Sequence, residues 1–189
     1  MTNPSPALHR WIALLRAINV GGHTITMEAL RAHFAALGFT QIGTFIASGN
    51  VIFESPVADA PALEAQIAQH LRQALGYTVA TFLRAPAELS AIAQYQPFPQ
   101  TEPNGAGHAL SVAFLPTAPD DVAQQRLLGL QTPIDDFHVH GCEVYWRCRT
   151  KVSDSTFSGA RLEQTLGMPA TLRNVTTVRR LAAKYGTGG

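Results

Sequence analysis

The chain has 189 residues, enough for one domain of ordinary size or two small ones. Hydrophobic residues make up 46% of it and charged residues only 14%, below the roughly 25% that is usual in soluble domains. The formal net charge is +1. This balance excludes global electrostatic steering toward nucleic acid or an acidic membrane, although it is compatible with a local basic patch.

The first half of the chain alternates strand and helix patterns. In chain order, it predicts a strand over 10–18, a helix over 27–37, strands over 41–47 and 50–54, a helix over 63–74, a strand over 78–83 and a short helix over 86–95. Thr26 or Thr24 can cap the first helix, and Gly38 and Gly76 stand where the two longer helices should end.

A change of composition divides the chain. Residues 97–108 are rich in Pro and Gly and have no consistent period, which predicts a linker between a first subdomain (1–96) and a second one (109–189). The second half predicts a strand over 109–115, a helix from 121 to about 130 capped by Asp120, strands over 135–139 and 143–148 that meet at Gly141, a helix over 157–166, a short strand over 171–173 and a last helix over 178–185.

This order of elements occurs twice and predicts the fold class. We expect an α+β protein of two consecutive ferredoxin-like (β-α-β-β-α-β) subdomains, with antiparallel sheets and a C-terminal helix. Right-handed crossovers make the first two strands of each unit end at the same edge of the sheet. The loop over 19–22 and the hairpin turn over 48–50 should therefore meet at one end of the first unit.

The segment over 16–22, Arg-Ala-Ile-Asn-Val-Gly-Gly, is the most unusual one in the chain. A strand that delivers two glycines and then a helix start can present backbone N–H groups to an anion, with charge from Arg16 and hydrogen bonds from Asn19. The candidate ligand-binding residues are Arg16, Asn19, Gly21, Gly22, Ser48, Gly49, Asn50, Arg173 and Asn174. The expected ligand is a small anion, including phosphorylated ones. The alternative is a tight strand-to-helix turn with Arg16 in solvent, since neither a dinucleotide fingerprint nor a phosphate-binding loop motif is present.

The sequence gives less support to a catalytic site or a metal site. Ser48 lacks the Gly-x-Ser-x-Gly context of a nucleophile, so an enzyme would use the same rim with His23 as general base, and no catalytic residue is assigned. His138, His140 and Cys142 would share one face of an uninterrupted strand, but Gly141 should turn the chain between them. We expect no metal and no cofactor.

Positive charge concentrates in the last quarter of the chain. The residues concerned are Arg147, Arg149, Lys151, Arg161, Arg173, Arg179 and Arg180. A solvated face explains them, and a nucleic-acid surface stays an unsupported alternative because the paired aromatics of RNA-binding sheets are missing. A third alternative is an interaction module that pairs through exposed sheet faces or edges.

The location is predicted from two features. The first ten residues lack the apolar region of a secretory signal, and the longest apolar run, over 11–20, is too short for a bilayer. Cys142 and Cys148 are placed so that they cannot bridge within one strand. We therefore expect a cytoplasmic protein without a membrane partner; its oligomeric state is not predicted.

Three motifs carry a resemblance to a known family. LRAINVGG (15–22), SGNVIF (48–53) and TLRNVTTV (171–178) occur in this order, and together they resemble the domain-of-unknown-function family 1697 over about residues 10–181. The resemblance implies two ferredoxin-like subdomains in a bacterial cytoplasmic protein, and it supplies no activity, cofactor or catalytic residue. Thr156 replaces a usual Lys, Val175 a common Trp and Ala17 a usual Gly. If the Lys and Trp contact a ligand in the family, this chain binds that ligand differently or more weakly.

Overall fold

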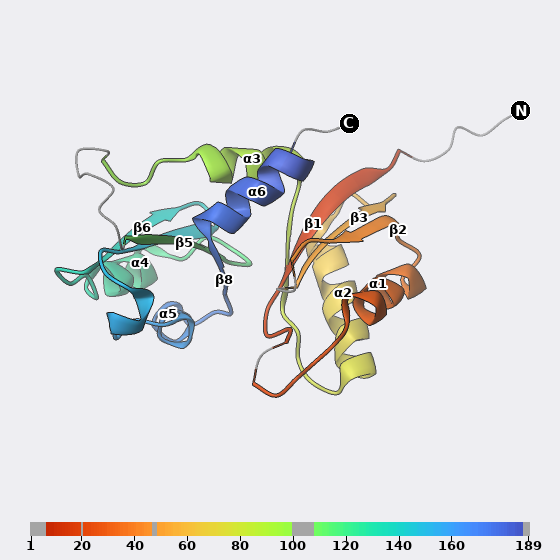
Figure 1. Ribbon diagram of the computed structural model, residues 1–189, viewed down its shortest axis with the longest axis horizontal. Coiled ribbons are helices and arrows are strands. Elements are labelled where there is room, and N and C mark those ends of the chain that lie inside the picture. Colours follow the sequence, from red (N-terminus) through yellow and green to blue (C-terminus); the bar gives the residue numbers. More distant parts are fainter. Residues whose placement is uncertain (1–6, 20, 47–48, 100–107, 187–189) are drawn as a thin grey trace, which may run out of the picture. The chain divides into compact units, whose positions relative to one another are not determined.

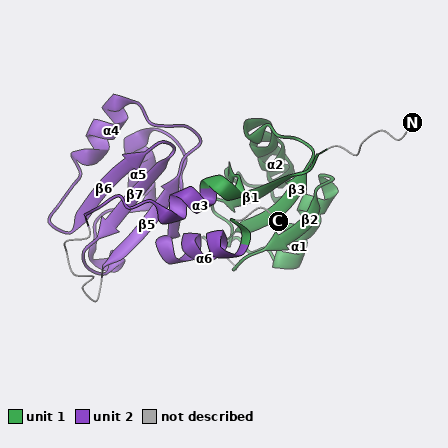
Figure 2. Cartoon of the chain, turned by 90° about the horizontal axis from the view of Figure 1, so that it is seen from above, with its two compact units in different colours: residues 1–88, 185–189 green, residues 89–184 purple. Residues whose placement is uncertain are grey.

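The computed structural model describes residues 7–19, 21–46, 49–99 and 108–186. Along the chain these residues form β1 (His9–Leu15), α1 (Met27–Ala36), β2 (Thr40–Thr44), β3 (Asn50–Ser55), α2 (Ala60–Leu75), β4 (Thr81–Arg84), α3 (Pro86–Gln94), β5 (Ala109–Phe114), α4 (Asp121–Leu128), β6 (Asp135–His140), β7 (Glu143–Cys148), α5 (Gly159–Leu166), β8 (Thr171–Asn174) and α6 (Val175–Tyr185) (Figure 1). The contacts divide the chain into two compact units, residues 1–88 with 185–189 and residues 89–184, which are coloured separately in Figure 2.

Each unit contains one four-stranded antiparallel sheet. The strand order is β2-β3-β1-β4 in the first unit and β6-β7-β5-β8 in the second. With a helix after the first and third strand of each sheet, both units have the ferredoxin-like arrangement. The predicted fold class, including the C-terminal helix α6, is confirmed.

Local signals in the sequence set the helix ends. The Thr26 hydroxyl accepts a hydrogen bond of 3.1 Å from the amide of Ala29 and caps α1, and the Asp120 carboxylate caps α4 through the amide of Ala123 at 2.7 Å. Each cap satisfies a backbone donor that the first helical turn leaves without a partner, which stabilises the helix by about 1 kcal/mol. Both caps confirm predictions.

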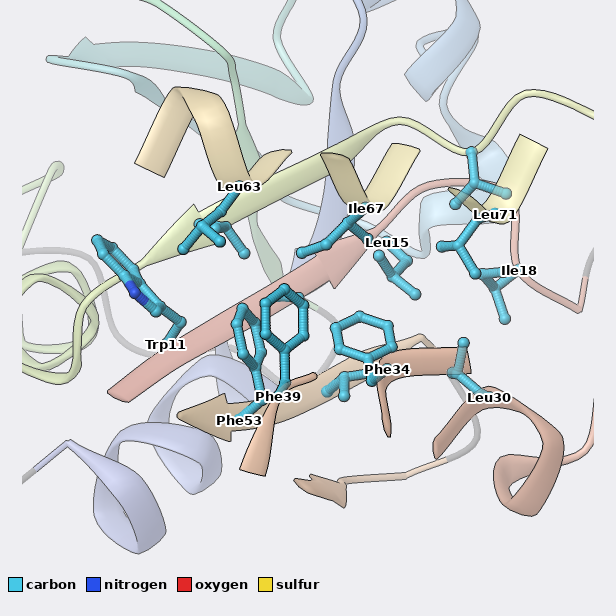
Figure 3. Close-up of a cluster of buried hydrophobic side chains, with 14 of the residues drawn as sticks. Trp11, Leu15, Ile18, Leu30, Phe34, Phe39, Phe53, Leu63, Ile67 and Leu71 are labelled. Carbon is cyan, nitrogen blue, oxygen red and sulfur yellow. The ribbon is translucent and has the colours of Figure 1, made fainter. Parts of the chain in front are cut away.

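The core of the first unit lies between its sheet and the helices α1 and α2. Figure 3 shows Leu63 and Ile67 of α2 above β1, with Phe34, Phe39 and Phe53 gathered in one aromatic group. The rings of Phe39 and Phe53 stack with their centroids 4.3 Å apart. Burying each of these side chains contributes on the order of 1.5–3 kcal/mol. The apolar face of α2 is therefore held against the apolar strand β1.

The second unit has a core of its own around Trp146 on β7. The Trp146 ring lies 5.0 Å from that of Phe157, and Phe157 also contacts Phe137 of β6 at 4.4 Å between centroids. The indole N–H donates a hydrogen bond of 2.8 Å to the buried carboxylate of Asp135. The start of β6 is thereby tied to β7 by a polar contact inside an apolar layer.

Some element boundaries differ from their predictions. β1 ends at Leu15 rather than at residue 18, because Ala17 has a left-handed backbone with a φ of 63° that a strand cannot hold. β4 begins at Thr81, and a short 3₁₀-helix over Val152–Asp154 has no counterpart among the predicted elements. The predicted linker over 97–108 stays a prediction, since residues 100–107 lie outside the described ones. None of the helices in the described ranges has the length and apolar character needed to cross a membrane.

Candidate functional site

The predicted meeting of the loop after β1 with the β2–β3 turn is present in the structure. β1 and β2 both run antiparallel to β3, so they end at the same edge of the sheet. The amide of Leu15 donates a hydrogen bond of 2.8 Å to the carbonyl of Gly49. Ser48, a predicted binding residue, lies outside the described residues. The edge is therefore built as expected, and its binding role stays a prediction.

The loop at this edge has an unusual backbone. Ala17, Asn19, Gly21 and Gly22 all have left-handed φ angles, of 63°, 57°, 61° and 88°. Glycine adopts this region freely and asparagine tolerates it, whereas in alanine it costs roughly 1–2 kcal/mol. Backbone strain of this kind is concentrated at binding and catalytic sites, which is the structural argument in favour of this loop.

The two asparagines of the predicted site hold the backbone of their own segments. The Asn19 side chain accepts a hydrogen bond of 2.7 Å from the amide of Ile25 and closes the loop. Asn50 is fully buried, and its amide donates to the carbonyl of Phe45 at 3.0 Å, across the end of the β2–β3 hairpin. Both contacts are to backbone groups of the protein, so these two side chains have an architectural function.

Other predicted residues of this rim are placed by packing. The Arg16 amide donates to the carbonyl of Ala80 at 2.9 Å, and its side chain is half-buried. The ring of His23, which the enzyme alternative would use as a base, stacks on Tyr77 with 3.9 Å between centroids. This stacking gives His23 a packing role beside the loop.

Arg173 and Asn174 lie in the second unit, on β8. Asn174 pairs with Ser111 and Thr171 with Phe114, so β8 starts at the edge where β5 ends and runs away from it. Asn174 therefore lies away from the edge of the second sheet that corresponds to the loop of the first unit.

The two side chains on β8 also differ in their environment. The Arg173 guanidinium is buried and donates to the Thr171 hydroxyl at 2.8 Å and to the Leu172 carbonyl at 2.9 Å, and burial lowers the pKa of Arg173 to about 10. Asn174 is exposed, and its side chain accepts a hydrogen bond of 2.8 Å from the amide of Thr176 at the start of α6. Arg173 is thus part of the interior, whereas Asn174 lies at the surface.

Asn174 lines a cavity of about 530 Å³ in the second unit, which the sequence did not predict. The central strand β5 brings its walls together, because Leu110 pairs with Arg147 on one side and Ser111 with Asn174 on the other. The first turn of α6 adds Thr176 and Arg179. Among the residues that the structure describes, the lining includes two arginines and His108 and no carboxylate.

One of these arginines is firmly held. The Arg147 guanidinium forms an ion pair of 2.7 Å with Asp136 of β6, and it lies 4.4 Å from the ring centroid of Phe98. Asp136 also pairs with Arg149 at 2.9 Å. Two guanidinium groups therefore share the Asp136 carboxylate beside the cavity. Arg179 is exposed and, within the described ranges, forms no ion pair of its own.

An aromatic and imidazole cluster adjoins the cavity at Tyr95. The Tyr95 hydroxyl and His138 Nε2 are 2.8 Å apart, and the Tyr95 ring stacks on His140 with 4.1 Å between centroids. Burial, with a smaller contribution from His140, lowers the pKa of His138 below its ordinary value of 6.5. His138 is therefore neutral at pH 7. Among the residues with assigned positions, no three His, Cys, Asp or Glu side chains gather as a metal site would need.

A signal for part of this site was present in the sequence. Arg147 and Arg179 both belong to the positive charge noted in the last quarter, but the same quarter contains arginines such as Arg161 that lie elsewhere on the unit. Only the pairing of β5 with β7 and β8 selects the arginines that share a cavity.

Comparisons with known proteins agree with this fold. The structure of the conserved bacterial protein SP0830 from Streptococcus pneumoniae matches with a TM-score of 0.71 and 22% sequence identity, covering 96% of this chain and 100% of that one. No curated protein matches the chain. The model of the family described as "Protein of unknown function (DUF1697)" matches residues 8–145, which include the first two motifs and end before the third. Since this match spans well over half of its length, the chain belongs to the DUF1697 family.

Proposed function

We propose that the protein binds a small anionic ligand, and that the charged group of the ligand is held by Arg147 and Arg179 in the cavity of the second unit. The observation that carries the proposal is that Arg147, Arg179 and His108 line the same cavity of about 530 Å³, with no carboxylate among its described residues. A cavity of this size is typical of small-molecule sites.

The two arginines supply different contributions. Arg147 is oriented by Asp136 and by the Phe98 ring, so it presents its charge without losing much side-chain freedom on binding. Arg179 follows Val175 by one helical turn and forms no ion pair within the described residues. A guanidinium donates two parallel hydrogen bonds to a phosphate or carboxylate, which favours these anions over halide-like ones.

Calorimetric titration with inorganic phosphate, sugar phosphates and nucleotides tests the proposal. We expect saturable binding that Arg179→Ala weakens about tenfold, because one charge-assisted hydrogen bond is worth about 1.5–3 kcal/mol. Arg126→Ala is the matched control, since it removes the same charge from α4, away from the cavity. Absence of binding, or equal affinities for the two variants, would overturn the proposal.

We also propose the loop edge of the first unit as a second site for the same class of ligand. It comprises Arg16, Asn19, Gly21, Gly22, Ser48, Gly49 and Asn50. The left-handed backbone of the loop supports this site, because successive amides in such conformations form concavities that bind anions. The same titration decides between the sites: Arg16→Ala weakens binding at the edge and leaves binding in the cavity unchanged.

We further propose that the protein works in the cytoplasm. The support is that Cys142 and Cys148 are not joined in a disulfide, and that the Cys148 thiol is buried in the second core. Fractionation of cells that express the tagged full chain tests this, and recovery in an extracytoplasmic fraction would contradict it.

A further inference from the structure

We infer that the ligand of this cavity is an aromatic phosphate, a planar ring linked to a phosphate group as in a nucleoside monophosphate. The inference rests on the proposed function and names its ligand class. It starts from the difference between the two walls of the cavity. The lining contains apolar and aromatic side chains, Tyr95, Phe98 and Leu110, which we call the aromatic wall, and polar ones, Asn174, Thr176 and Arg179, which we call the polar wall.

The aromatic wall is held rigidly. Phe98 lies between Pro97 and Pro99, whose rings fix the φ angles on both sides of it, and all three residues line the cavity. The Phe98 ring is also packed between neighbours, with the Arg147 guanidinium 4.4 Å from its centroid and the His138 ring edge-on at 6.3 Å. A ring that is already ordered binds another flat group at little cost in conformational entropy.

The cation over this wall favours a π system. A guanidinium group stacks on aromatic faces, and the Arg147–Phe98 contact shows that this one does so. A planar ring placed against the wall would extend this stack. His140 covers one face of Tyr95 at 4.1 Å between centroids, and the Arg147 guanidinium covers one face of Phe98. We assign Phe98 to the ligand because a planar ring there would continue the stack with the cation.

The polar wall suits the phosphate group. The Thr176 backbone amide is already bonded to Asn174 Oδ1, so the donors that this wall offers are the side chains of Thr176 and Arg179 and the Asn174 side-chain NH2 group. A bare phosphate would occupy a small part of about 530 Å³ and leave the apolar wall in contact with water. A ligand with both a ring and a phosphate covers the aromatic wall and also accepts hydrogen bonds from the polar wall. The ring alone or the phosphate alone does only one of these.

The test compares adenosine monophosphate with its two halves, ribose 5-phosphate and adenosine, by calorimetry on the full chain. We expect the nucleotide to bind at least tenfold more tightly than either half. Phe98→Leu, which keeps apolar volume but removes the flat face, should weaken nucleotide binding about tenfold and leave ribose 5-phosphate binding unchanged. Phe98→Tyr should restore nucleotide affinity. Arg179→Ala should weaken both phosphates.

The outcomes separate this inference from the proposed function. If the nucleotide and ribose 5-phosphate bind equally and both depend on Arg179, the anion site stands and the aromatic ligand class is wrong. If neither phosphate binds, both proposals fall. Unchanged melting temperatures of the Phe98 variants show that any loss of affinity is local and not a loss of folding.

Discussion

Gly49 accepts a hydrogen bond of 2.8 Å from the amide of Leu15, and the two residues are packed so closely that a Cβ at position 49 would be crowded. A Cβ built on Gly49 would lie 3.2 Å from the Leu15 carbonyl oxygen and equally close to the Cβ atoms of Leu15 and Ile18. Contacts this short are tighter than ordinary van der Waals packing, so the turn or the loop after β1 would have to shift to admit any other residue at this position.

Gly49→Ala should therefore destabilise the first unit more than left-handed backbone alone would. Gly76→Ala at the end of α2 is the matched control, because its φ of 78° resembles the 73° of Gly49 and a Cβ there meets nothing within 4 Å. We expect losses in the free energy of unfolding of about 3 kcal/mol for Gly49→Ala and about 1 kcal/mol for Gly76→Ala, measured by urea denaturation. Equal losses would show that the close packing has no energetic effect.

The loop that follows depends on Asn19. Asn19→Ala removes the acceptor of the 2.7 Å hydrogen bond from Ile25 and places alanine at a φ of 57°, so it should cost about 2 kcal/mol. Asn19→Asp replaces the amide oxygen with a carboxylate oxygen that also accepts from Ile25, and aspartate tolerates the left-handed backbone, so its cost should be small. Chemical denaturation of both variants measures the difference. An alanine variant as stable as the aspartate variant would mean that the side chain does not close the loop in solution.

Much of the fold could be predicted because its signals are local. Helix caps such as Thr26 and Asp120 act over three residues, and the apolar period of α2 is visible within one segment. The order of these elements then leads to a ferredoxin-like sheet through general rules of handedness. The predicted strand ends were less accurate where the backbone has a conformation that its residue type does not indicate. Ala17 is an example, because alanine rarely adopts the left-handed backbone that it has here.

The cavity could not be predicted, because its walls come from distant segments of the chain. Arg147 on β7 and Arg179, on the helix that follows β8, are brought together by the pairing of β5 with β7 and β8, and a one-residue change of register would turn Arg147 to the opposite face. The edge of the first unit could be predicted because it follows from the order of the elements. The cavity could not, because it depends on the register between strands. The binding role of the predicted edge stays a prediction.

Asp135 should be the most sensitive polar position in the second unit. Its buried carboxylate accepts hydrogen bonds from the Trp146 indole at 2.8 Å and from the Ser155 hydroxyl at 2.9 Å. Asp135→Ala leaves a buried indole N–H without an acceptor and should cost about 3 kcal/mol in the free energy of unfolding. Ser155→Ala removes one donor to Asp135 and the acceptor of the Phe157 amide, but leaves the Trp146 contact intact, so a smaller loss of about 1–2 kcal/mol is expected. Similar losses in urea denaturation would contradict the central position of Asp135.

The final prediction concerns pH and starts from His33 on α1. The ring of His33 meets that of His70 on α2 edge-on at 5.4 Å, and His70 Nε2 is buried with no partner among the described residues. Burial, followed by the charge of His70, lowers the pKa of His33 below its ordinary value of 6.5. The unfolded chain then binds more protons than the folded one once the pH falls below about 6.5, so this contribution to stability is complete above that pH and is lost below it.

Melting temperatures measured between pH 7.5 and 5.5 test the sign of this effect. The wild-type protein should lose stability toward pH 5.5, and His33→Gln should lose less, because glutamine has no proton to gain. His9→Gln at the exposed start of β1 is the control and should follow the wild type. The comparison also removes the opposing effect of Glu64, whose pKa is raised by burial, since that carboxyl is the same in all three proteins. If His33→Gln and the wild type lose stability equally, the contact with His70 does not hold His33 neutral, and the acid sensitivity arises from other groups such as His138.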